Sequence, residues 1–125
     1  MRANVIISIG SFNAALAIML GAFAAHGLKN QLDSYSLGVF NTAADFHLIH
    51  SLALILLGVI ANQYRQINCS LVGYLFLVGI ILFSGSLYAL SVSGWKILGI
   101  ITPFGGMSFI LAWGLLCYQM ITAAD

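Results

Sequence analysis

Apolar residues dominate the chain in four long runs that short polar segments separate. The runs cover residues 5–25, 43–61, 71–90 and 97–118. Each run has about 18 or more residues with few or no charges, and a helix of that length crosses the hydrocarbon layer of a membrane. The pattern predicts an all-α membrane protein: four transmembrane helices in an up-and-down bundle, forming a single transmembrane domain over residues 1–125.

The segment between the first and second runs has a different pattern. Leu28, Leu32, Tyr35 and Val39 are spaced by four, three and four residues, and polar side chains lie between them. This spacing is typical of an amphipathic helix. We expect the segment either to lie in the membrane interface or to lead directly into the second transmembrane helix.

Small residues recur along one face of the first run, at alternating steps of four and three. Such a stripe lets two helix backbones approach closely in lipid, where packing drives helix association. We expect it to face a neighbouring helix of the same chain, with a second copy of the protein as the alternative. The residues are Gly10, Ala14, Ala17, Gly21 and Ala24.

The fourth run contains Pro103, Gly105 and Gly106. Proline removes a backbone donor and clashes with the preceding turn, so we expect a helix kink at these three residues. Alternatively, the helix starts here, with Thr102 as its N-cap and Pro103 in the first helical position, where proline is well tolerated.

Composition supports the membrane assignment, because 62% of the residues are hydrophobic and only 6% are charged. This small number of charges cannot cover the surface of a water-soluble domain. Most of the protein surface therefore faces lipid. A net charge of +1 argues against nucleic acid as a partner. Cys69 and Cys117 have no metal-ligand spacing, and we expect two inert thiols. Alternation of the spans places both on the same side of the membrane, so a disulfide between them is the alternative.

Polar residues converge on one side of the predicted bundle. In an up-and-down arrangement, the end of the first helix, the start of the second, the end of the third and the start of the fourth lie in the same leaflet. That half of the bundle is the candidate site for a ligand or a polar network. Its residues are His26, Asp45, His50, Ser84, Ser86, Tyr88 and Thr102.

Ionisable groups inside a membrane are costly and usually pair with each other. We expect an internal hydrogen-bonded pair between Asp45 and either His26 or His50. Two alternatives remain: a metal site formed by His26, Asp45, His47 and His50, and a proton relay through Asp45 and His50. The serines lack the Gly-x-Ser-x-Gly pattern of a nucleophile, so we expect them to hold helices together.

Four motifs resemble a known family: Leu20–Leu28, Phe46–Ala53, Leu82–Tyr88 and Ile101–Gly106. Together and in this order they are similar to the small membrane-protein family catalogued as domain of unknown function 423. The resemblance implies a four-helix, multi-pass protein of the bacterial inner membrane and carries no established activity.

The same resemblance bears on the choice among the polar residues. The family pattern includes an acid and a histidine that match Asp45 and His50, and His47 is outside it. The resemblance therefore weakens a metal-ligand pair of His47 with His50 and favours Asp45, His50 and His26 as the central polar residues.

These observations predict a non-enzymatic membrane-stabilising or accessory protein without metal or cofactor. We expect it to bind a lipid, a small ligand or a partner helix at the polar cluster, with membrane lipids, a homo-oligomer or a partner membrane protein as its partners. The alternative is an oligomeric transporter or channel for protons or cations, in which Asp45 and His50 carry the ion.

Overall fold

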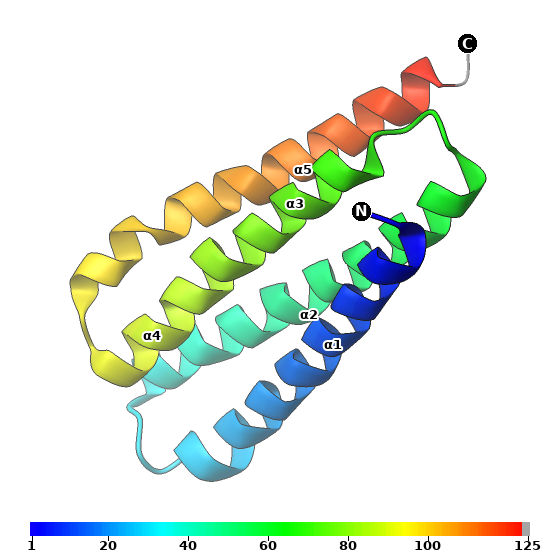
Figure 1. The fold of residues 1–125 in the computed structure, drawn as a ribbon. Helices are drawn as coiled ribbons and strands as arrows, with labels where there is room; N and C mark the ends of the chain where they lie inside the picture. The colour runs from blue at the N-terminus through cyan, green and yellow to red at the C-terminus, as the bar shows by residue number, and fades with distance from the viewer. Residues whose placement is uncertain (124–125) are drawn as a thin grey trace.

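Four helical spans run antiparallel to one another in the computed structural model, which describes residues 1–123 and shows no strand in that range (Figure 1). All four are long and apolar enough to cross a membrane, so the prediction of four transmembrane helices is confirmed. Three spans contain a segment that is not α-helical. The elements are α1 (Ala3–Phe23) with the π-helical turn η1 (Ala24–Leu28), α2 (Ser34–Gln63), α3 (Cys69–Gly79) with the π-helical η2 (Ile80–Gly85) and α4 (Ser86–Ser93), and the 3₁₀ helix η3 (Lys96–Ile100) with α5 (Thr102–Thr122).

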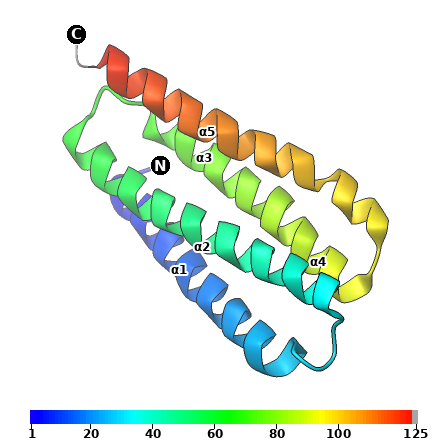
Figure 2. The same ribbon diagram turned by 180° about the vertical axis from the view of Figure 1, so that it is seen from behind.

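The four spans lie next to one another in the order first, second, third and fourth. α1 packs mainly against α2, while α5 packs mainly against α3 and η2. Both ribbon views place α1 and α5 at opposite edges, with α2 and the third span between them (Figure 2). α2 is therefore the central helix, and half of its most apolar stretch is buried inside the protein.

α2 begins well before the apolar run that predicts it. The carboxylate of Asp33 accepts a hydrogen bond from the backbone N–H of Ser36 (2.6 Å), which caps the first turn. From Ser34 the helix continues unbroken to Gln63. The amphipathic segment thus leads directly into the second transmembrane helix and does not form a separate interfacial helix.

The small-residue stripe of the first helix faces α2, a neighbouring helix of the same chain, as expected from the sequence. A Cβ atom on Gly10 would lie 2.8 Å from the carbonyl oxygen of Ser51, so only glycine permits this approach. Gly21 lies near the Cβ atom of Ala44. Further along, Ile6, Leu54 and Phe76 are fully buried in the main apolar core. Cys69 and Cys117 are free thiols.

The predicted kink at Pro103 is wrong. α5 begins at Thr102, so Pro103 lies in its first turn, where a backbone donor has no intrahelical acceptor to lose. The alternative of a helix start is correct, although the cap position is Ile101 and not Thr102. Gly105 is a packing residue, because a Cβ atom there would collide with the backbone of Phe83 in η2.

We expect Gly105→Ala to destabilise the protein by about 1–3 kcal/mol, because the added methyl would force α5 away from η2. Thermal unfolding in mild detergent measures the effect. Gly114→Ala is the matched control on the same helix, since nothing lies within 4 Å of a Cβ atom at that position. The control should leave stability unchanged or raise it slightly, because alanine favours helix. Equal melting temperatures for the two variants would contradict the close approach.

Candidate functional site

A buried histidine joins three of the four spans. The ring of His47, on α2, is only 3% exposed. Its Nδ1 lies 3.1 Å from the hydroxyl of Tyr88 on α4, and its Nε2 lies 3.1 Å from Oδ1 of Asn13 on α1. Tyr88 also packs its ring against Phe40 at a centroid distance of 4.8 Å. Each polar atom of the imidazole therefore has a partner within the protein.

The direction of these hydrogen bonds follows from the backbone. Nδ2 of Asn13 donates to the carbonyl oxygen of Ile9 (2.9 Å), which turns Oδ1 toward His47. Because Oδ1 only accepts, Nε2 of His47 carries the hydrogen and donates it. Nδ1 then accepts the O–H of Tyr88. His47 is thus held as one neutral tautomer.

His50 lies on another side of α2 and makes a separate set of contacts. Its Nδ1 donates to the carbonyl oxygen of Phe46 (2.8 Å), and its Nε2 accepts the indole N–H of Trp113 (3.3 Å). The imidazole stacks on the ring of Phe109, with centroids 3.5 Å apart and planes within 7°. The rings of Phe76, Phe46 and Trp113 also surround it, at centroid distances of 5.7, 6.0 and 6.2 Å. His50 therefore links α2 to α5 as a neutral ring with the opposite tautomer.

Neither histidine has a ring nitrogen left for a metal ion. All four nitrogens already take part in hydrogen bonds. In residues 1–123, no three side chains of the His, Cys, Asp or Glu type are grouped so that they could hold a metal. The metal alternative therefore has no ligand set in the described part of the chain.

The hydroxyl groups of the predicted serines and threonine differ in whether they have a hydrogen-bond partner. The hydroxyls of Ser86 and Thr102 lie 2.6 Å apart and join α4 to α5, as expected of residues that hold helices together. Ser84 is fully buried, and its hydroxyl has no hydrogen-bond partner in the described residues. A lone buried hydroxyl destabilises a folded protein.

The predicted pairing of Asp45 with a histidine is wrong. Asp45 and His26 are both exposed, and neither makes a side-chain hydrogen bond to a histidine or an acid in residues 1–123. Two residues along an α-helix turn by about 200°, so Asp45 faces away when His47 faces inward. His26 lies in η1, at the end of the first span.

Sequence reasoning missed three members of the internal network: His47, Asn13 and Trp113. The family resemblance points away from His47 because the family pattern does not include it, and no motif in the sequence marks Asn13 or Trp113. One signal was available, since Asn13 is the only strongly polar side chain near the middle of the first run. A polar group at that depth needs a partner from another helix.

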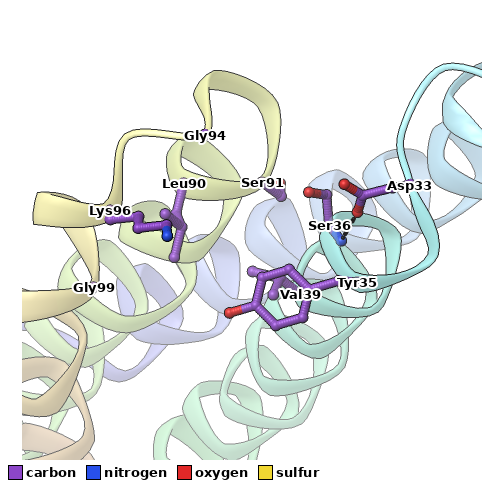
Figure 3. A pocket seen from close by; sticks show the side chains of 9 residues that line it. All are labelled: Asp33, Tyr35, Ser36, Val39, Leu90, Ser91, Gly94, Lys96 and Gly99. Carbon is purple, nitrogen blue, oxygen red and sulfur yellow. Dashed lines mark hydrogen bonds between the residues drawn. The ribbon is translucent and has the colours of Figure 1, made fainter.

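A pocket of about 570 Å³ opens at the end of the bundle that holds the α1–α2 and α4–η3 connections. Figure 3 shows side chains from the start of α2 on one side of it and those from α4 and η3 on the other. A more open groove of about 410 Å³ shares Tyr35 and Val39 with the pocket. The pocket residues are Asp33, Tyr35, Ser36, Val39, Leu90, Ser91, Gly94, Lys96 and Gly99. The groove is lined by Ser34, Tyr35, Gly38, Val39, Thr42 and Leu87.

Comparison with known proteins identifies similar chains. The family described as "Protein of unknown function (DUF423)" matches residues 20–106. UPF0382 membrane protein YwdK of Bacillus subtilis is 44% identical over 111 residues, which cover 88% of this chain and 90% of that protein. UPF0382 membrane protein SSP2132 of Staphylococcus saprophyticus is 43% identical over 113 residues, 90% of this chain and 93% of that protein. No solved structure matches.

We expect His47→Leu to lower the free energy of unfolding by about 1–3 kcal/mol, because Asn13 and Tyr88 would lose their buried partner. Equilibrium unfolding in mixed detergent micelles measures the change. Asp45→Leu is the matched control, two residues away on the exposed side of α2, and should not destabilise. If Asp45→Leu cost as much as His47→Leu, the assignment of the network to His47 would be wrong.

Ser84→Ala should leave stability unchanged or raise it, since it removes a hydroxyl that lacks a partner. Ser86→Ala should lower stability by about 1 kcal/mol, because it removes the hydrogen bond to Thr102. Both substitutions delete one oxygen atom from a buried serine of the same span, so melting temperatures can be compared directly. A larger loss for Ser84→Ala would show that its hydroxyl has a partner.

Proposed function

The chain belongs to the DUF423 family of membrane proteins, and from this premise we propose that it is a non-enzymatic accessory protein of the membrane that binds a lipid. The proposed site is the pocket between the start of α2 and the α4–η3 connection, together with the adjoining groove. The observation that carries the proposal is the continuity of the two hollows at the end of the bundle. A pocket that contains charged side chains, joined to a groove along the outside of the helices, has the shape that a headgroup and an acyl chain require.

The position of the pocket fits the headgroup layer. The charged residues Lys29, Asp33 and Lys96 all lie in or beside the connections at this end of the bundle. Trp95, next to Lys96, is 66% exposed, and tryptophan is enriched at the membrane–water interface. These residues favour a location where lipid headgroups meet the protein.

The internal polar residues support a structural role for the histidines. His47 and His50 have both ring nitrogens occupied by protein partners, so their hydrogen bonds stabilise the bundle. In the described residues, no ring nitrogen of either histidine is hydrogen-bonded to a serine, threonine or cysteine that it could activate, and the Ser51 hydroxyl donates to the backbone carbonyl of His47. Because these buried polar groups already bind one another across the helices, the outer surface fits a ligand-binding role better than the interior does.

The transporter alternative has less support from the geometry. A proton relay from Asp45 to His50 requires both groups on one path, but Asp45 is exposed and His50 is buried among aromatic rings. What favours an oligomer is Asp45 itself, because a carboxylate on the outside of a transmembrane helix is costly without a partner. A second copy or a partner membrane protein that covered this side of α2 would supply one.

Purification in a mild detergent followed by native mass spectrometry tests lipid binding. We expect the wild type to retain one lipid, and Gly38→Phe to lose most of it. A Cβ atom at Gly38 has nothing within 4 Å and the residue lines the groove, so the phenyl ring would fill the space without a clash. Gly114→Phe is the matched control, on an equally open position of α5. The proposal fails if the wild type retains no lipid or if Gly38→Phe retains as much as the control.

A further inference from the structure

We infer that the pocket is specific for a phosphoethanolamine headgroup, with its phosphate at Lys96 and its ammonium at Asp33. The inference rests on the proposed lipid-binding function and names the lipid class. A zwitterionic headgroup of this kind carries one anion and one primary ammonium on a short linker. The pocket likewise holds one cationic and one anionic side chain, Lys96 and Asp33.

The two charged side chains stand on opposite walls. Asp33 precedes α2, whereas Lys96 begins η3, and Figure 3 shows them on different sides of the pocket. In the part of the chain that the structure describes, no hydrogen bond joins them, and Asp33 interacts with the start of its own helix. The space between them can therefore take a ligand with both charges.

The wall at Asp33 suits an ammonium group. The backbone N–H of Ser36 donates to Oδ1 of Asp33 and holds the pKa of this carboxyl below its ordinary value. Asp33 is therefore a carboxylate at neutral pH. A carboxylate has about four acceptor sites, so oxygen lone pairs remain for the N–H donors of a primary ammonium.

The wall at Lys96 suits a phosphate group. The Lys96 ammonium supplies the cationic donor, and a charged hydrogen bond of this type is stronger than a neutral one. The hydroxyl of Tyr35 faces the pocket in Figure 3 and offers a second donor. The cation of Lys96 on one wall and the carboxylate of Asp33 on the other give the pocket two chemically different ends.

The adjoining groove explains why the ligand is a lipid and not the free headgroup. From the pocket, Val39 and Leu87 continue an apolar lining along α2 and α4, beside Gly38 and Thr42. An acyl chain in this groove would make van der Waals contacts with these apolar side chains, and such packing is what drives association within lipid. Free phosphoethanolamine would gain none of this.

Two common headgroups fit less well for chemical reasons. Phosphocholine has a trimethylated ammonium that cannot donate a hydrogen bond to Asp33. Phosphoglycerol has no cation, so Asp33 would face a neutral or anionic ligand without compensation. The pocket therefore predicts preference for phosphatidylethanolamine over phosphatidylcholine and phosphatidylglycerol.

The test is competition for the full-length protein among the three lipids with identical acyl chains, measured by native mass spectrometry. We expect about tenfold more bound phosphatidylethanolamine than phosphatidylcholine, the effect of one hydrogen bond to a charged group. Asp33→Asn should abolish this preference while it keeps the helix cap, because asparagine caps as well as aspartate. Lys96→Gln should weaken phosphatidylethanolamine and phosphatidylglycerol alike. Lys29→Gln is the control: it removes a nearby cation that does not line the pocket, and it should change neither.

Four results would overturn the inference. Equal binding of the three lipids, or an unchanged preference in Asp33→Asn, would refute the headgroup assignment and leave the lipid-binding function intact. Displacement of bound lipid by equimolar free phosphoethanolamine would show that the acyl chain plays no part. Absence of any bound lipid would refute both the inference and the proposed function. Unchanged melting temperatures would show that the variants are folded.

Discussion

The hydrogen bonds of His47 to Asn13 and Tyr88 are the interaction on which the rest of the arrangement depends. Inside a membrane no water satisfies a polar group, so each donor and acceptor must find a partner in the protein. His47 meets this need by joining α1, α2 and α4 at one buried point. Its two bonds fix how α1 and α4 rotate against α2, because a turn of either helix would leave a polar atom without a partner.

The same requirement shapes the packing around the network. Trp113 and Phe109 enclose His50 from α5, so the fourth span is held to α2 through aromatic contacts although its backbone packs on α3. Close approach at Gly10 and Gly105 brings the flanking helices near enough for these side chains to meet. The polar interior is thus used for assembly, and the outer surface near Lys96 is where the structure offers space.

The sequence allowed the fold to be predicted, but much less of the site. Long apolar runs identify spans because length and hydropathy are properties of local sequence, and Gly10 and Gly21 marked the face of α1 that meets α2. The pairing of Asp45 could not be derived, because it depends on how far each helix is rotated about its axis. Alternation of the spans placed Tyr88 at the correct end, yet its partner His47 is determined by rotation. The pocket depends on the path of two connections, which no periodicity specifies.

One further consequence comes from η2, the π-helical segment between α3 and α4. A wider turn accommodates an additional residue, and one residue corresponds to about 100° of rotation in an α-helix. The third span therefore consists of two helices, α3 and α4, that are rotated relative to each other about the span axis. In α3, Phe76 packs against Trp113 of α5. In α4, Tyr88 contacts His47 and Leu90 lines the pocket. An insertion or deletion within η2 would rotate α4 about its axis relative to α3. The side chains of α4 that line the pocket would then point elsewhere, although none of them had been substituted.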